Sequence, residues 1–126
     1  MATLNQNAIA LAATSGNVAA AVATATLPAL PGRMTYITGF QVTGSGQTGA
    51  STIVDITVGN LGVPGSTVLH YELVSQIGVT IQNTPLIVNF DPPLPATAMN
   101  TTIAVTCPSL GAGSTNNCVN AMGFYL

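Results

Sequence analysis

Short segments in which apolar and polar residues alternate make up most of this chain, and clusters of glycine, proline, asparagine and serine separate them. The alternation is clearest in 33–43, where one parity carries the apolar residues Met34, Tyr36, Phe40 and Val42. A period of two with aromatic and β-branched residues is typical of a strand with one buried face. The pattern therefore predicts a strand with these four side chains on the core face.

The same reasoning, applied to the whole chain, predicts eight or nine short strands. Beyond the first 27 residues, the expected strands are 33–43, 51–59, 67–74, 77–81, 86–90, 100–107 and 117–125. Closely spaced short strands with turn signals between them predict an all-β fold. The expected architecture is an antiparallel two-sheet β-sandwich with jelly-roll or Greek-key topology.

The first 27 residues allow more than one interpretation. Segments 7–13 and 17–27 are rich in alanine, which favours helix, but the second also alternates with valine and threonine, and the Ser-Gly-Asn sequence at 15–17 is a turn signal. We expect two strands, with a helix or an extended arm as the alternatives. Residues 1–16 are accordingly expected to form an N-terminal arm or edge strand, and 17–126 a single β-sandwich domain.

A proline-rich segment should mark one end of the domain. Residues 91–95 read Asp-Pro-Pro-Leu-Pro, and proline donates no ladder hydrogen bond, so this segment cannot lie in a central strand. We expect a rigid, extended crossover there. The chain then closes with a predicted hairpin, in which a turn-rich loop joins strands 100–107 and 117–125.

The predicted hairpin holds the only two cysteines, Cys107 and Cys118. Each falls on the apolar parity of its expected strand, Cys118 together with Met122, Phe124 and Leu126. Directly opposed residues of an antiparallel pair lie at a separation that a disulfide can bridge, so a bond across the base of the loop is one interpretation. Two free, buried thiols in a reducing compartment are the other.

The loop between the two cysteines is uncharged and rich in glycine. At one end of a sandwich it would be displayed where another subunit could dock. Its candidate partner-contact residues are Pro108, Leu110, Asn116 and Asn117.

Charged residues make up only 3% of the chain, and lysine is absent, against about 25% in typical soluble domains. One arginine cannot build a basic surface, so we expect no nucleic-acid partner. The alanine-rich start is too short for a membrane span of about 20 residues and lacks the positive region of a secretion signal, so we expect no membrane partner and synthesis in the cytoplasm. So little charge does not keep copies apart, which favours assembly.

Arg33 is the only strong cation and begins an expected strand. We expect it to form an ion pair with Asp55. The alternatives are Asp91, the C-terminal carboxylate of Leu126 and a group on a partner chain.

His70 and Glu72 lie two residues apart on expected strand 67–74, and so share the face opposite Tyr71. They could form a histidine–carboxylate dyad, but an ordinary surface pair is the favoured interpretation. The glycine spacing in 44–49 matches a dinucleotide loop by letter, yet it joins two strands and offers a phosphate no helix N-terminus. Two cysteines and one distant histidine do not complete a zinc site. We expect no catalytic residue, no cofactor, no metal and no enzymatic activity.

Three stretches resemble a known group of proteins. Residues 31–40 read Pro-Gly-Arg-Met-Thr-Tyr-Ile-Thr-Gly-Phe, 85–96 read Pro-Leu-Ile-Val-Asn-Phe-Asp-Pro-Pro-Leu-Pro-Ala, and 110–126 contain Leu-Gly-Ala-Gly-Ser-Thr-Asn and then Val-Asn-Ala-Met-Gly-Phe. With the alanine-rich start, they resemble small β-sandwich virion proteins that tailed bacteriophages and their prophages encode among their structural genes. The likeness covers about residues 17–126, and its motifs are structural.

The resemblance implies capsid decoration, a head fibre or a related virion role, often as a trimer, and it implies no role for the cysteines. The expected function is therefore a decoration or cement subunit on the virion surface, with its own copies and the major capsid protein as partners. The alternative is a receptor- or carbohydrate-binding module of a surface fibre. It ranks lower because the chain lacks tryptophan and Tyr36 and Tyr71 are expected in the core. A surface-filament subunit that exchanges residues 1–16 as a donor strand is a third hypothesis.

Overall fold

The computed structural model describes residues 7–78 and 82–126, and this part of the chain confirms the all-β fold class. Eight strands are present among these residues. They are β1 (Ile9–Thr14), β2 (Ala23–Leu27), β3 (Thr35–Ser45), β4 (Thr52–Gly59), β5 (Leu69–Ser75), β6 (Leu86–Pro95), β7 (Ile103–Cys107) and β8 (Asn116–Tyr125). The described residues contain no helix long and apolar enough to cross a membrane.

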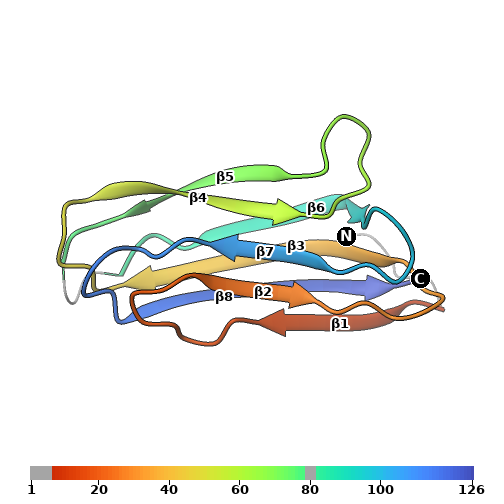
Figure 1. Ribbon diagram of the computed structural model, residues 1–126, viewed down its shortest axis with the longest axis horizontal. Helices are drawn as coiled ribbons and strands as arrows, with labels where there is room; N and C mark the ends of the chain where they lie inside the picture. The colour runs from red at the N-terminus through yellow and green to blue at the C-terminus, as the bar shows by residue number, and fades with distance from the viewer. Residues whose placement is uncertain (1–6, 79–81) are drawn as a thin grey trace.

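The strands form two antiparallel sheets that pack face to face (Figure 1). Sheet A has the order β1-β8-β3-β6, and sheet B has the order β2-β7-β4-β5. β1 pairs with β8, β2 with β7, β3 with β6 and β4 with β5. These are the pairings of one long antiparallel ribbon rolled onto itself, so the β-sandwich has jelly-roll topology.

β2 illustrates how the sequence pattern builds the core. Ala23, Ala25 and Leu27 are fully buried, whereas Thr24 and Thr26 between them are exposed. Successive side chains of a strand point to opposite faces, so the alternation places one face of β2 on the core and the other in water.

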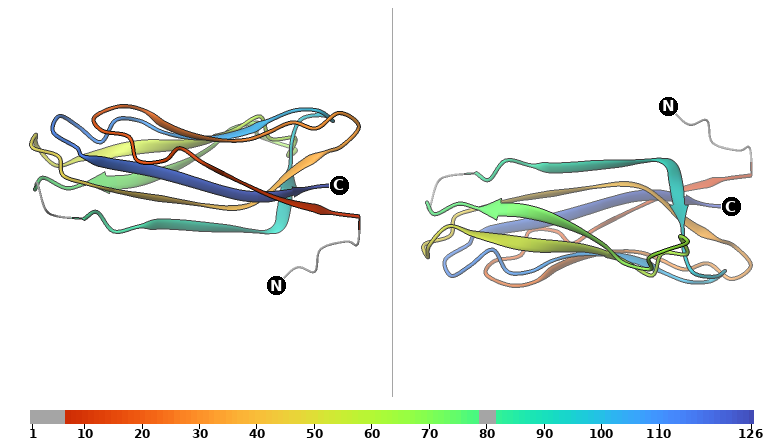
Figure 2. Two further views of the ribbon diagram at one scale, coloured as in Figure 1. Left: turned by 90° about the horizontal axis from the view of Figure 1, so that it is seen from below. Right: turned by 90° about the horizontal axis from the view of Figure 1, so that it is seen from above.

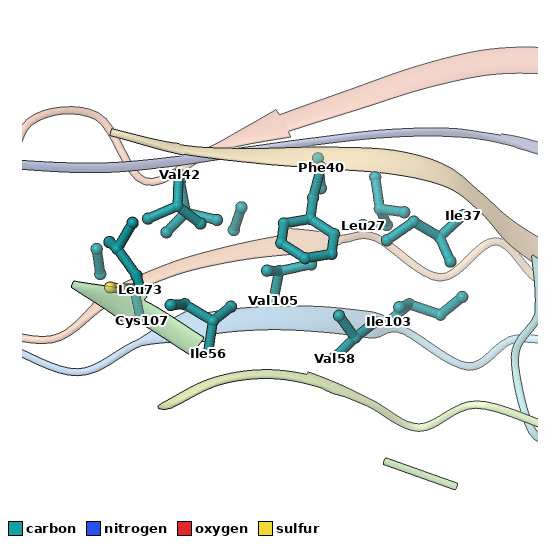
Figure 3. Packing of buried hydrophobic residues seen from close by; sticks show 14 of the residues in the cluster. Leu27, Ile37, Phe40, Val42, Ile56, Val58, Leu73, Ile103, Val105 and Cys107 are labelled. Carbon is teal, nitrogen blue, oxygen red and sulfur yellow. The ribbon is translucent and has the colours of Figure 1, made fainter. Parts of the chain in front are cut away.

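The core lies between the two sheets. Figure 3 shows Phe40 of sheet A pointing toward Val105 of sheet B, with Ile56 and Val58 of β4 on the same side of the interior as Val105. All four side chains are fully buried. The two inner faces therefore interdigitate as in other aligned sandwiches.

At the N-terminus two strands form, as expected, but the second begins only at Ala23, and 17–22 belong to the connection before it. β1 is an edge strand of sheet A, paired with β8, and β2 is an edge strand of sheet B. Residues 1–6 of the expected arm lie outside the described residues, as do 79–81 of expected strand 77–81. Ile77 itself forms only an isolated bridge, with Gln47.

The proline-rich segment 91–95 forms the end of β6, an edge strand of sheet A. There the chain bends sharply toward sheet B (Figure 2), and Ala96 forms a bridge with Leu61, which follows β4. The Asp91–Pro92 peptide bond is cis. The edge position and the turn between layers agree with the expected crossover.

The prediction for β3 is wrong at Tyr36 because the strand contains a bulge. Its registers with β6 and β8 both shift between Ile37 and Gly39, and one extra residue reverses the faces on its far side. Phe40 faces the core as expected, but before the bulge Ile37 is the fully buried residue. Tyr36 instead stacks on Phe124 of β8, with ring centroids 5.0 Å apart.

The predicted closing hairpin is also wrong. β7 lies in sheet B and β8 in sheet A, so the connection 108–115 crosses the sandwich. The parity of β8 is reversed as well: Val119 and Ala121 are fully buried, whereas Met122 and Leu126 are exposed. A turn-rich connection has the same sequence signature whether it joins neighbours in one sheet or crosses between two sheets.

Candidate functional site

Four connections between strands meet at one end of the sandwich, which we call the loop end. They are 15–22, 46–51, the described parts of 76–85, and 108–115, on the left in Figure 1. The backbone amide of Thr48 donates to the carbonyl of Ala112, at 2.8 Å. This bond ties the connection after β3 to the connection before β8. The amide of Ala20 donates to the carbonyl of Ser114 and that of Gly78 to the carbonyl of Gln47, both at 2.9 Å, so all four connections are joined.

Buried polar side chains hold the loop end together from inside. Gln47, Ser75, Asn83 and Ser114 are almost fully buried. Nε2 of Gln47 donates to the carbonyl of Ser75 (2.7 Å), and Oγ of Ser75 donates to the carbonyl of Leu110 (2.6 Å). Because buried polar groups with satisfied partners favour one arrangement, the loop end is preorganised.

A polar hollow of about 440 Å³ opens at the loop end. Its lining comes from segments far apart in the sequence: Asn17, Thr43, Gly44, Ser45, Gln82, Thr115 and Asn116. Nδ2 of Asn116 donates to Oγ of Ser45 (3.4 Å) and Oγ1 of Thr115 (3.3 Å). These described lining residues offer amides and hydroxyls and no ionisable group, which suits a neutral, polar ligand.

The predicted partner-contact loop is only partly available at the surface. Asn116 is exposed and lines the polar hollow, and Pro108 is half-buried. Leu110 is buried beneath Gly44, where an added Cβ would overlap with a Leu110 methyl group. Asn117 is fully buried, and its Nδ2 donates to the carbonyl of Pro108 at 3.2 Å. The expectation that Leu110 and Asn117 contact a partner is therefore wrong.

Sequence reasoning missed the other side chains of the polar hollow, such as Asn17, Thr43 and Gln82. They are ordinary polar residues in a chain full of them, and only the topology brings them beside Asn116. The one available signal was the lack of charge in all of these connections.

Both cysteines are free thiols, so the disulfide interpretation is wrong. Cys107 is fully buried on β7 of sheet B, as the free-thiol alternative predicts. Cys118 was expected in the core, but it lies half-buried on sheet A, with its Sγ 3.9 Å from Oγ1 of Thr14. Burial raises the pKa of the Cys107 thiol to about 11, and a hydrogen bond from Asn117 partly offsets this.

The expected ion pair between Arg33 and Asp55 is not formed. Nη1 of Arg33 donates to the carbonyl of Asn7 (3.1 Å), whereas Oδ2 of Asp55 accepts from Nδ1 of His70 (2.8 Å). His70 and Glu72 share the exposed face of β5, as predicted. The His70–Asp55 pair lies in the open on that face, without the enclosed environment that tunes a catalytic base.

The described residues that line the polar hollow include no aromatic side chain, so they form no aromatic platform there. Tyr71 faces the core as predicted, with its ring centroid 5.2 Å from that of Phe40 in an edge-to-face contact. Burial raises the pKa of Tyr71.

Within residues 7–78 and 82–126, no group of three or more histidine, cysteine, aspartate or glutamate side chains is placed to hold a metal ion. Comparisons of the chain with protein-family models, with curated proteins and with solved structures found no match. The function is therefore inferred from the fold and the surface of the chain itself.

Proposed function

We propose that this chain is a structural virion protein, a decoration or cement subunit on the head of a tailed bacteriophage, that acts by binding and not by catalysis. The observation that carries the proposal is the composition of its surface. Ten large hydrophobic side chains are exposed among the described residues, and only four residues of the chain are charged, one basic and three acidic. A surface of this kind is suited to burial against other subunits.

The fold is compatible with this role, since jelly rolls occur in viral capsid proteins and in lectins. A fold does not by itself assign a function. The resemblance of segments 31–40 and 85–96 to phage virion proteins favours the capsid role.

The proposed assembly is a homotrimer that binds the major capsid protein at the virion surface after synthesis in the host cytoplasm. A closed ring of copies covers apolar side chains that a monomer leaves in water. Because few charges contribute, the assembly should be insensitive to salt.

Mass spectrometry with copy counting on particles from a host that encodes the chain tests the virion role. We expect many copies per particle, and a purified chain that sediments as a trimer at micromolar concentration in both low and molar salt. Absence from the particles would contradict the virion role. A monomer in sedimentation would contradict the trimer.

The polar hollow favours a second candidate function, binding of a neutral glycan by a fibre-type module. Its hydroxyls and amides match the hydrogen-bonding groups of a sugar. We expect a glycan-array signal that Asn116→Ala abolishes and Asn89→Ala retains, because Asn89 is also exposed but lies outside the hollow. A wild-type chain that binds no glycan on the array would remove this candidate.

A further inference from the structure

The two edge strands of sheet A, β1 and β6, each leave one side of the strand unpaired in the sheet. β1 reads Ile-Ala-Leu-Ala-Ala-Thr and 86–90 of β6 read Leu-Ile-Val-Asn-Phe, so neither stretch contains a charge or a proline. Natural edge strands use such residues to avoid pairing with other chains. In Figure 1, β1 lies along the lower margin of the molecule. Both stretches are therefore open to strand pairing.

The backbone groups of Ala10, Ala12 and Thr14 point away from β8. The amide of Ser15 donates to the carbonyl of Val119 (2.9 Å), in the same register that pairs β1 with β8. Successive residues of a strand direct their backbone groups to opposite sides, so the odd-numbered residues of β1 bond to β8. The even-numbered residues therefore offer donors and acceptors to a strand placed alongside.

On β6 the backbone groups of Ile87 point away from β3 in the same way. The carbonyl of Gly44 accepts from the amide of Asn83, on the β6 side of the sheet (2.8 Å). Even-numbered residues of β3 beyond its bulge therefore bond toward β6. Val42 is paired with Leu86, so Leu86 bonds to β3, and Ile87 faces the free edge.

A mainly apolar groove of about 400 Å³ lies beside β1 on the outer face of sheet A. Leu11 and Ala13 pack against the core, so the side chains of Ala12 and Thr14 are on the outer face. Both are small, so a large side chain on an added strand can reach over them into the groove. The described residues that line the groove, none of them ionisable, are Ala12, Ala13, Thr14, Gln41, Asn120, Ala121 and Met122.

Ile87 is a large, exposed apolar side chain on the same outer face. Thr14 is paired with Asn120, which is in turn paired with Gln41 of β3. Gln41 is paired with Ile87, and directly paired residues point to the same face of a sheet. The two edges of sheet A thus carry complementary features, a groove beside β1 and a large apolar side chain on β6.

The directions of the two strands also suit a ring of copies. β1 is antiparallel to β8, β8 to β3, and β3 to β6, so β1 and β6 run in opposite directions. A rotation about an axis along the strands keeps each direction, so β6 of one copy meets β1 of the next as an antiparallel pair. A cyclic trimer needs two different surfaces of this kind on each copy, because its contacts are head-to-tail.

We propose that β6 of one copy pairs with β1 of the next, so that the three copies of sheet A form one closed ring. The inference rests on the homotrimer put forward above and names its contact. Backbone groups of Ala10, Ala12 and Thr14 bond to the free edge of β6, and Ile87 enters the groove of the neighbouring copy. Closure leaves sheet A without a free edge.

Sedimentation equilibrium of matched variants tests the apolar part of the contact. Ile87→Asp places a charge in the groove, and Ile53→Asp is its control, because Ile53 is 62% exposed against 59% for Ile87 but lies on sheet B. We expect Ile87→Asp to raise the dissociation constant of the assembly about 30-fold or more, and Ile53→Asp less than about threefold. Circular dichroism checks that both variants fold.

Amide hydrogen exchange of the wild-type trimer tests the backbone part without any substitution. The amides of Leu11 and Ala13 bond to β8 within one copy and serve as the internal reference. We expect the amides of Ala10 and Ala12 to exchange within about tenfold of this reference, because a strand of the next copy protects them. In a free edge strand they would exchange much faster.

The outcomes separate this contact from the proposed assembly. A wild-type chain that stays monomeric through the micromolar range overturns the homotrimer and the contact together. Two other results leave the trimer standing and overturn the contact. One is an Ile87→Asp variant that assembles like Ile53→Asp, and the other is exchange at Ala10 and Ala12 more than about tenfold faster than the reference.

Discussion

The two long sides of the sandwich are closed in different ways. On the closed side, formed by edge strands β1 and β2, the connection 15–22 passes between the sheets. The amides of Ser15 and Val18 donate to carbonyls of Val119 and Asn117, both at 2.9 Å. This connection, which we call the strap, is bonded to β8, and the inward side chains of β2 that follow it are fully buried.

On the open side, formed by edge strands β5 and β6, the core is only partly covered. Its half-buried side chains are Leu69, Tyr71, Leu86, Val88 and Phe90. A groove of about 300 Å³ runs there, lined by Glu72, Leu73, Val74, Gln76, Thr84, Pro85 and Leu86.

The difference shows that one alternating pattern gives two degrees of burial. Small alanines and a hydrogen-bonded strap seal the closed side. On the open side, large side chains and the proline-rich strand β6 leave the edges of the two sheets apart. The prolines of β6 after Phe90 and the charges of β5 protect these edges from strand pairing.

The largest expected effect comes from removing the same atoms on the two sides. Leu27 and Leu86 both lie on edge strands, but Leu27 is fully buried and Leu86 half-buried. We expect Leu27→Ala to lower the free energy of unfolding by about 3–5 kcal/mol, because it leaves a closed cavity. Leu86→Ala should cost about 1–2 kcal/mol, because its site is already open to water. Urea unfolding followed by circular dichroism measures both.

Equal losses in the two variants would contradict the distinction between the sides. The dependence of the two losses on protein concentration tests this distinction further. If assembly covers the open side, the loss in Leu86→Ala depends on protein concentration, whereas the loss in Leu27→Ala does not.

The next largest effect concerns glycines where strands approach closely. A Cβ at Gly123 of β8 would overlap with the carbonyl oxygen of Tyr36, and β8 is held between β1 and β3. A Cβ at Gly39 would lie 2.7 Å from the carbonyl oxygen of Val88, but β6 is an edge strand beside the open side and can shift. We expect losses of about 3 kcal/mol for Gly123→Ala and about 1 kcal/mol for Gly39→Ala.

Thermal unfolding measures these losses, with Gly59→Ala as the control because an added Cβ there meets nothing within 4 Å. A Gly39→Ala variant as unstable as Gly123→Ala would show that β6 is held as firmly as β8.

The sequence pattern was sufficient where a strand is regular. In β2 and β5 the inward residues follow strict alternation, and the predicted faces of Leu73 and Tyr71 are correct. In β3 the bulge between Ile37 and Gly39 appears in the pairing with both β6 and β8. The alternation within β3 alone therefore does not predict it. For the same reason Tyr36 was placed on the wrong face.

The candidate site was harder to predict than the fold. The pairing of Cys107 with Cys118 assumed that strands adjacent in sequence are adjacent in one sheet, and the jelly roll places them in two. The polar hollow depends on residues as far apart as Asn17 and Asn116. Nothing local distinguishes these side chains, so only the topology identifies them.

A third prediction uses the buried thiol on the closed side. Burial raises the pKa of Cys107 from 9.0 to about 11, so the folded state keeps the proton more tightly than the unfolded state. This contribution is fully present below pH 9 and is lost as the pH rises to about 11. A shift of this size corresponds to roughly 2–3 kcal/mol.

Urea unfolding at pH 8 and at pH 11 measures the contribution of the Cys107 thiol to the free energy of unfolding, with Cys107→Ala as the reference. We expect the wild-type protein to lose about 2–3 kcal/mol more than the variant over this interval. Parallel losses in wild type and Cys107→Ala would mean that the closed side does not shield the thiol.

The smallest effect is expected on the outer face of the open-side strands, at Asp55. Asp55→Asn removes the carboxylate that accepts from His70 at 2.8 Å, which costs less than about 1 kcal/mol for an exposed pair. The substitution also removes the repulsion from Glu72, directly opposite, and this gain has a similar size. The two effects should nearly cancel, so urea unfolding at neutral pH should show a change within about 0.5 kcal/mol. A loss above about 1.5 kcal/mol would mean that this face is enclosed in solution. In that case Glu72→Gln, which removes the repulsion and keeps the bond between His70 and Asp55, should be more stable than Asp55→Asn.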